Sequence, residues 1–238
     1  MKTKVILSSL LAVVVSVIAT IFLTLNRSKS EQKYKIIHNI ILMDESGSMS
    51  SLRNTAIDGA ADVINSVRAA NDTIPDLKQY LTLVFFEGYR KLHLKYIVDG
   101  SPINECEAEV DQYRPCGCTP LFDAIGEVVL HHTPNIGQDD YVMMTIITDG
   151  MENASTKFHA KDIKKMVKDL SSRNWSFTYI SANQDAIHEG NKIGIRDSHN
   201  YLNTYDGYSR MISSENSRRN AAISRMSREQ VRKKERRN

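Results

Sequence analysis

The stretch Ile36-Ile-His-Asn-Ile-Ile-Leu-Met43, followed by Asp44-Glu-Ser-Gly-Ser-Met-Ser50, decides the fold. Its first half is an apolar run with two polar interruptions, a pattern typical of a strand buried on both faces inside a parallel sheet. Its second half begins with a carboxylate and offers three hydroxyls. Because open parallel sheets place their ligand sites just beyond the carboxyl ends of strands, we expect Asp44, Ser46 and Ser48 to lie at such a site.

These side chains form a particular set of donors. One carboxylate with two alternate hydroxyls supplies hard oxygen ligands, which suit Mg²⁺ better than metals that prefer thiolate or imidazole. We expect Gly47 to let the loop turn tightly by adopting a positive φ. The alternative is that Ser46, Ser48 or Ser50 only caps the helix that follows.

Two further stretches place polar side chains beside predicted elements. The run Tyr141–Thr148 has the same buried-strand pattern and is followed at once by Asp149. Between the two strands, Thr119 precedes Pro120, and proline is tolerated in the first turn of a helix. Two aspartates therefore close two apolar strands, and a hydroxyl stands before a predicted helix.

With all three stretches in view, the chain resembles a von Willebrand factor A domain with a metal-ion-dependent adhesion site, over roughly residues 34–205. The family's Asp-x-Ser-x-Ser motif matches Asp44, Ser46 and Ser48, its single threonine matches Thr119, and its distal aspartate matches Asp149. Three ordered motifs on separate loops are more specific than any one of them.

The resemblance implies a role for each of these residues. Asp44, Ser46 and Ser48 would ligate Mg²⁺, which Mn²⁺ or Ca²⁺ could replace. Thr119 would join directly or through water, and Asp149 mostly through water. An acidic side chain of a protein partner would then complete the octahedron, so the implied activity is metal-dependent binding.

Two other function classes fit parts of the pattern. A metal-dependent hydrolase or phosphatase could use Asp44 as a ligand or nucleophile. The position two residues after Asp44 is Ser46, however, so the Asp-x-Asp pattern of aspartyl-phosphate enzymes is absent. A metal-free structural version of the same fold is disfavoured by the full set of five oxygen-bearing residues.

The rest of the domain alternates between helices and strands. This alternation predicts an α/β fold with a doubly wound, mostly parallel sheet. A short link at Gly88 joins strands 80–86 and 89–98 into a hairpin, which gives the sheet one antiparallel edge strand. The other predicted strands are 141–148, 175–181 and 200–204. The predicted helices are 52–70, 120–131, 158–171 and 184–189, with an acidic helical turn within 104–113.

Charge is divided unevenly along the 238 residues, whose overall net charge is +3. Residues 1–35 carry six basic and one acidic group, and residues 210–238 carry ten basic and three acidic groups. The intervening residues 36–209 keep 15 basic and 24 acidic groups, a net charge of −9. An acidic body disfavours general nucleic-acid binding, and its negative field would concentrate divalent cations.

The N-terminal region predicts a membrane tether. Val5–Leu25 contains no charged residue, and as a helix it would reach roughly 30 Å, the thickness of a bilayer core. We expect a retained single-pass anchor between a basic end (1–4) and a polar linker (26–33), with a cleaved signal peptide as the alternative. The basic residues that flank Val5–Leu25 lean slightly towards a cytoplasmic location for the domain (34–207).

The C-terminal region 208–238 has helix-forming composition without proline or glycine. We expect its first half to pack on the domain as a closing helix and its second half to project. The basic end Arg232–Arg237 is either a solvated helix terminus or a contact for anionic lipid or nucleic-acid phosphate, without specific nucleic-acid recognition.

The three cysteines, Cys106, Cys116 and Cys118, are expected to be reduced thiols. Cys106 with either of the others would be the geometric candidate for a disulfide, because Cys116 and Cys118 are too close in sequence to bridge easily. A zinc site that included the cysteines is a disfavoured rival, since its histidines (93, 131, 132 and 159) follow no recognised spacing.

Overall fold

The computed structural model describes residues 35–74, 76–149, 151–182 and 186–201, and residues 210, 213–214, 216–221 and 223–224 near the C-terminus. The predicted anchor Val5–Leu25, the linker 26–33 and the basic end Arg232–Arg237 lie outside these residues. Among the helices that are described, none has the length and apolar character needed to cross a bilayer.

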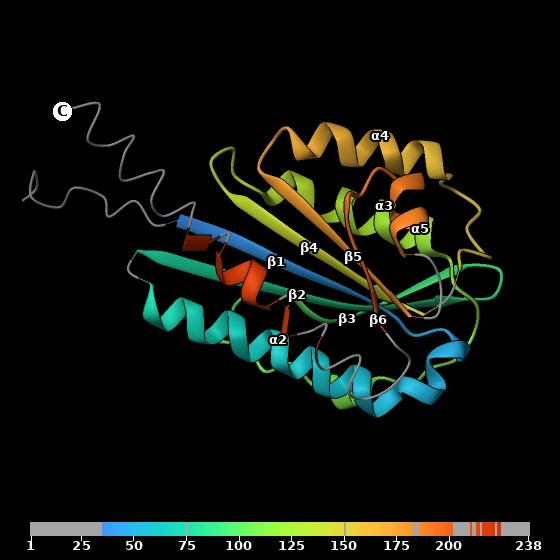
Figure 1. The fold of residues 1–238 in the computed structure, drawn as a ribbon, viewed down its shortest axis with the longest axis horizontal. Helices are drawn as coiled ribbons and strands as arrows, with labels where there is room; N and C mark the ends of the chain where they lie inside the picture. The colour runs from blue at the N-terminus through green and yellow to red at the C-terminus, as the bar shows by residue number, and fades with distance from the viewer. Residues whose placement is uncertain are drawn as a thin grey trace, which may run out of the picture. The chain divides into compact units, whose positions relative to one another are not determined.

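A six-stranded sheet organises the domain (Figure 1). Its order is β3-β2-β1-β4-β5-β6, with β3 antiparallel to β2 and every other neighbouring pair parallel. The strands are β1 (Lys35–Asp44), β2 (Leu77–Gly88), β3 (Leu92–Pro102), β4 (Tyr141–Thr148), β5 (Trp175–Ala182) and β6 (Asp197–Tyr201). The predicted mostly parallel α/β sheet with one antiparallel edge strand is therefore confirmed.

Helices cover both faces of the sheet. α3 (Leu121–His132), α4 (Ala160–Ser171) and α5 (Ala186–Lys192) lie on one face, and α2 (Arg53–Thr73) lies on the other (Figure 1). Short 3-10 turns are η1 (Gly47–Leu52), η2 (Val110–Gln112) and η3 (Thr133–Asn135). This two-sided covering explains why the central strands read as continuous apolar runs.

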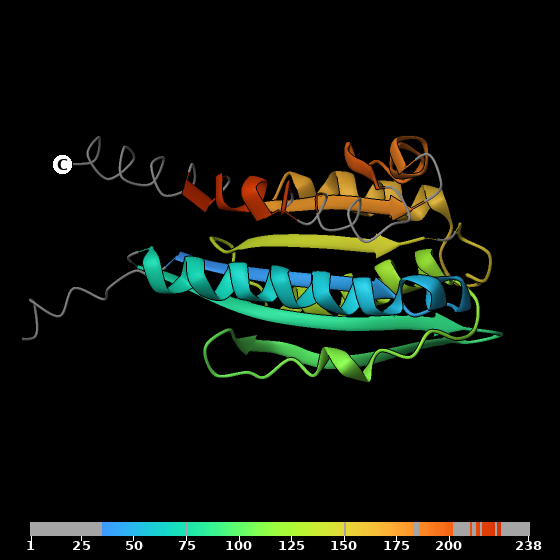
Figure 2. The ribbon, with the colours of Figure 1, turned by 60° about the horizontal axis from the view of Figure 1, so that its bottom comes forward.

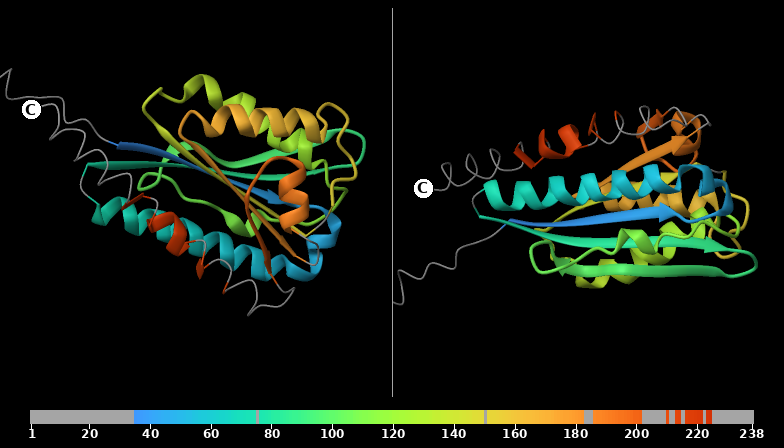
Figure 3. Two further views of the ribbon diagram at one scale, coloured as in Figure 1. Left: turned by 45° about the horizontal axis from the view of Figure 1, so that its top comes forward. Right: turned by 90° about the horizontal axis from the view of Figure 1, so that it is seen from below.

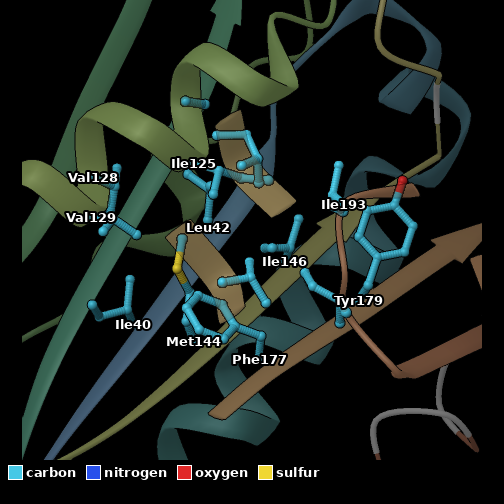
Figure 4. Packing of buried hydrophobic residues seen from close by; sticks show 14 of the residues in the cluster. Ile40, Leu42, Ile125, Val128, Val129, Met144, Ile146, Phe177, Tyr179 and Ile193 are labelled. Atoms are coloured by element: carbon cyan, nitrogen blue, oxygen red, sulfur yellow. The ribbon is translucent and has the colours of Figure 1, made fainter. Parts of the chain in front are cut away.

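Alternate side chains of β1 build two separate cores. Ile40 and Leu42 belong to the core beneath α3 and α4, part of which Figure 4 shows, whereas Ile41 and Met43 belong to the core beneath α2. All four are at most 1% exposed. Because successive residues of a strand point to opposite faces, one apolar strand supplies both layers.

The described residues of the C-terminal segment are helical and run beside α2 (Figures 2 and 3). Ile223 packs in a third apolar cluster with residues of β1 and β4, among others. Arg219 is 1% exposed and donates hydrogen bonds of 2.6 Å to Asn39 Oδ1 and to Thr145 Oγ1. The described residues of this segment therefore pack on the domain through apolar and polar contacts.

Some boundaries differ from the predictions. The acidic helical turn predicted within 104–113 is reduced to the 3-10 turn η2, where three residues are regular. The last strand begins earlier than predicted, at Asp197, because β6 pairs with β5 from Thr178 onward. Residues 202–204 of the predicted strand lie outside the described residues.

Replacement of Leu42 by alanine should reduce the free energy of unfolding by about 2–5 kcal/mol, because the fully buried side chain would leave a cavity between β1 and α3. Urea denaturation would measure the change. Leu130→Ala is a matched control, since Leu130 is 50% exposed on α3 and its loss should cost less than about 1 kcal/mol. Equal losses in the two variants would contradict this assignment of the core.

Candidate metal centre

Two aspartates meet at one edge of the sheet. Asp44 is the last residue of β1, and Asp149 follows the last residue of β4. These strands pair in parallel with Met43 opposite Ile147, so their carboxyl ends reach the same edge. The sheet topology therefore brings together residues that stand 105 positions apart in the sequence.

A continuous chain of hydrogen bonds joins four of the five predicted ligands. Asp44 Oδ1 accepts a bond from the backbone N–H of Ser46 (2.8 Å). The hydroxyls of Ser46 and Ser48 lie 3.1 Å apart, and Ser48 Oγ donates to Asp149 Oδ1 (2.7 Å). On its other oxygen, Asp44 accepts a bond from Thr148 Oγ1 (2.5 Å).

The fifth residue, Thr119, is positioned through its backbone. Its N–H donates to Asn153 Oδ1 (2.9 Å), and the N–H of Asn153 donates back to the carbonyl oxygen of Thr119 (3.2 Å). Two residues earlier, the carbonyl oxygen of Gly117 accepts a bond from Gly47 N (3.1 Å). The loop before α3 is thus fastened both to the loop after β1 and to the loop after β4.

Two acidic residues that were not predicted as site residues hold the loop after β4 in place. Glu152 Oε2 accepts a bond from the backbone N–H of Phe122 (3.0 Å), in the first turn of α3. Asp123 is 4% exposed and accepts bonds from the backbone N–H groups of Thr156, Lys157 and Phe158. The position of Asp123 in the first turn of α3 was the available signal for that residue. The partners of both carboxylates lie 30 or more residues away in the sequence, so no local pattern reveals them.

Burial changes the acidity of both aspartates. Asp44 is fully buried, and this desolvation raises its pKa to about 6, against the hydrogen bonds from Thr148 and Ser46 and with a smaller contribution from the charge of Asp149. Burial also raises the pKa of Asp149, although the bond from Ser48 opposes this shift. Two partly desolvated carboxylates at one edge favour a proton or a cation between them.

The expected positive φ of Gly47 is wrong, and the alternative role of the serines as helix caps is disfavoured. Gly47 does not have a positive φ. Gly117 has one instead (φ +74°), in the loop that faces Gly47. At the start of η1, Ser46 makes no side-chain capping bond, and the hydroxyls of Ser46 and Ser48 are directed into the carboxylate cluster. This arrangement disfavours the capping alternative for these two serines.

Cys106, Cys116 and Cys118 are all free thiols in the structure, and Cys106 lies beside Ile103 and Arg68, away from this edge. Burial raises the pKa of Cys106 and of Cys116, so neither is biased towards the thiolate that a soft metal would need. The donors that converge at the sheet edge are oxygen atoms of carboxylates and hydroxyls. Their chemistry fits a hard divalent cation such as Mg²⁺.

Comparison with solved structures identifies the fold. The chain is similar to proximal thread matrix protein 1 from the mussel byssus, in a structure whose MIDAS motif (metal-ion-dependent adhesion site) is occupied by zinc. The TM-score is 0.59 and the sequence identity is 15%, and the match covers 79% of this chain and 46% of the mussel protein. It is also similar to a von Willebrand factor type A protein from Catenulispora acidiphila (TM-score 0.54, 14% identity, 76% and 42%). The fold is therefore of the von Willebrand factor A type.

A third similar structure is the pilus adhesin SpaC from Lactobacillus rhamnosus GG in an open conformation, with a TM-score of 0.57 and 12% identity over 77% of this chain and 30% of the adhesin. This chain thus spans less than half the length of each of these proteins. No protein-family model and no curated protein sequence matches the chain.

Replacement of Asp44 by asparagine should stabilise the metal-free protein at pH 8. Asparagine resembles the protonated carboxyl group that burial favours, and a pKa raised from 3.8 to about 6 corresponds to roughly 3 kcal/mol lost by the wild type on ionisation. Because the folded pKa is raised, the stability that the protonated Asp44 contributes is fully present below about pH 4 and is lost as the pH rises through 6.

Denaturation in the presence of a chelator at pH 4 and pH 8 would measure this difference. The gap between Asp44→Asn and wild type should widen with pH, whereas Asp58→Asn, at an exposed position of α2, should stay within about 0.5 kcal/mol of wild type at both. A gap that is absent at pH 8 would show that the ionised carboxylate is adequately solvated.

Proposed function

We propose that this protein is a binding module that uses Asp44, Ser46, Ser48, Thr119 and Asp149 to hold Mg²⁺ and so captures an acidic side chain of a protein partner. The observation that carries the proposal is the hydrogen-bonded chain from Asp44 through the two serines to Asp149. It gathers hard oxygen donors from two loops, and the backbone bonds of Thr119 bring the third loop to them.

The oxygen donors explain why the bound cation would attract an acidic side chain of a partner. Serine and threonine hydroxyls are neutral, so a divalent cation would keep part of its charge beyond what the two aspartates offset. Such a cation favours an additional anion, and a carboxylate is the hard anion that proteins carry. Mn²⁺ or Ca²⁺ could replace Mg²⁺ at oxygen ligands, and the zinc in the mussel protein's MIDAS motif indicates that such sites also accept Zn²⁺.

Binding accounts for this geometry better than hydrolysis. Both carboxylate oxygens of Asp44 already accept hydrogen bonds, from Ser46 and Thr148, and the group is buried, which limits it as a nucleophile. Metal-dependent phosphate release from a simple ester, lost in Asp44→Asn, would reverse this preference and favour the hydrolase alternative.

Exposed side chains with apolar surface occur at the same edge of the sheet as the proposed cation. Met151, two residues after Asp149, is 63% exposed, and Tyr89, in the turn that follows the carboxyl end of β2, is 76% exposed. The carboxyl end of β2 pairs with Asp44, so both side chains belong to the same edge of the sheet. A partner that presents an acidic residue among apolar ones would match this surface.

The proposal extends to the ends of the chain on sequence grounds. Val5–Leu25 would tether the module to a membrane in a single pass, with a slight lean to the cytoplasmic side, and Arg232–Arg237 would contact anionic lipid. Membrane fractionation of the full chain against residues 34–238 tests the tether. Recovery of the full chain in the soluble fraction would remove that part of the proposal.

Metal binding at this edge can be measured directly with Mn²⁺ as the probe. The full chain should bind one Mn²⁺ that excess Mg²⁺ displaces, as followed by the electron paramagnetic resonance signal of free Mn²⁺. Asp44→Asn and Ser48→Ala should each weaken this binding at least about tenfold, because each removes a ligand or its charge. Addition of acetate should lower the water-proton relaxation rate of the bound Mn²⁺, as a carboxylate replaces a water.

Ser50→Ala is the matched control for Ser48→Ala, since Ser50 is exposed in the same turn and its hydroxyl donates to the Gly47 carbonyl oxygen (2.7 Å). It should bind Mn²⁺ like the wild type. Equal affinity in Ser48→Ala and Ser50→Ala would overturn the metal assignment, and an acetate response that is absent would overturn the open position.

A further inference from the structure

A second cluster of metal-ligand side chains lies away from the oxygen site. Asp99 on β3 and His131 and His132 at the end of α3 each offer a ligand atom, and the three atoms all lie within 4.8 Å of one another. β3 runs antiparallel to β2. Asp99 is level with Thr82 of β2, because the N–H of the next residue, Gly100, donates to Thr82 Oγ1. Thr82 is four residues before Phe86, the partner of Asp44, so the two clusters are separated by about 13 Å along the strand direction.

Each histidine lies close to one oxygen of the same carboxylate. Asp99 Oδ2 lies 3.0 Å from His131 Nε2, and Asp99 Oδ1 lies 3.5 Å from His132 Nε2. With bonds of about 2.0–2.1 Å to zinc, neighbouring ligand atoms in a tetrahedral site are roughly 3.3 Å apart. The separation of Asp99 from His131 is slightly shorter than this value and that from His132 slightly longer, each measured from a different oxygen of the carboxylate.

The surroundings hold the two imidazoles in place. The ring of Tyr96, on the same strand as Asp99, lies 5.1 Å from the ring of His131. The two histidine rings are perpendicular, with centroids 4.8 Å apart. Adjacent residues of a helix point in different directions, but Asp99 approaches both rings because it presents one carboxylate oxygen to each.

His132 provides the observation that distinguishes this cluster from an ordinary surface ion pair. It is only 8% exposed, and its Nε2 atom is buried without a hydrogen-bond partner among the described residues. Burial lowers the pKa of His132, against the nearby charge of Asp99, so the imidazole favours its neutral form. A buried polar atom without a hydrogen bond is costly. A metal ion bound to this neutral ring nitrogen and to the nearby carboxylate would offset that cost.

We propose that Asp99, His131 and His132 form a second metal site, selective for Zn²⁺ or a similar borderline transition metal. Two imidazoles and one carboxylate suit such ions, whereas Mg²⁺ prefers oxygen ligands alone. Three protein ligands leave a fourth position for water or for a donor from another molecule. A bound ion would also fasten the edge strand β3 to the end of α3.

The test must separate this site from the oxygen site, which can also accept Zn²⁺. The full chain with Asp44→Asn serves as the background, and Zn²⁺ alone is titrated by calorimetry. His131→Gln in this background should remove one equivalent of bound Zn²⁺ or weaken it at least about tenfold. His131 is chosen because its side chain is 48% exposed, so its replacement leaves the core intact. Zn²⁺ should also raise the melting temperature of the background but not of the double variant.

His93→Gln is the matched control, since His93 also lies on β3 and pairs with a carboxylate, Glu87, but is not in the cluster. In the Asp44→Asn background it should bind as much Zn²⁺ as the background itself. The proposal is overturned if His131→Gln and His93→Gln behave alike, or if the background binds no Zn²⁺ at micromolar concentration. Either result leaves the Mn²⁺ measurements at the oxygen site unaffected.

Discussion

The burial of one carboxylate at the end of a two-sided apolar strand is the constraint on which the rest of this structure depends. Asp44 is fully buried because β1 is the central strand, paired on both sides and covered on both faces. Its charge is tolerated through bonds from Ser46 and Thr148, and these bonds fix the first turn after the strand. The loops before α3 and after β4 then fasten to that turn, so one costly group determines the geometry of a whole edge.

Local patterns were sufficient to predict the sheet and to place Asp44 and Asp149 at one of its edges. Apolar runs that end on Asp44 and Asp149 mark strands and the edge where they finish, since both signals lie within a few residues. The supporting contacts of Asn153, Glu152 and Asp123 could not be predicted, because each links loops about 30 residues apart. Nor could the φ of Gly47 and Gly117, which depends on how the two loops face each other.

The histidine and aspartate cluster shows the same limit more clearly. A zinc site among scattered histidines was disfavoured on spacing, yet β3 and α3 bring Asp99 beside His131 and His132. Their approach depends on the register of the β2–β3 hairpin, which contains irregularities between Leu81 and Val84, and on where α3 ends. Neither quantity is readable from residue periodicity.

Arg219 has a consequence for how the closing segment can move. Its guanidinium group bonds to Asn39 on β1 and to Thr145 on β4, two buried polar side chains of the central strands. A slide of one helical turn would withdraw these bonds together and leave buried polar groups unsatisfied, which is costly in a dry interior. We therefore expect the segment to be either docked in this one register or detached from the sheet, without a stable intermediate register.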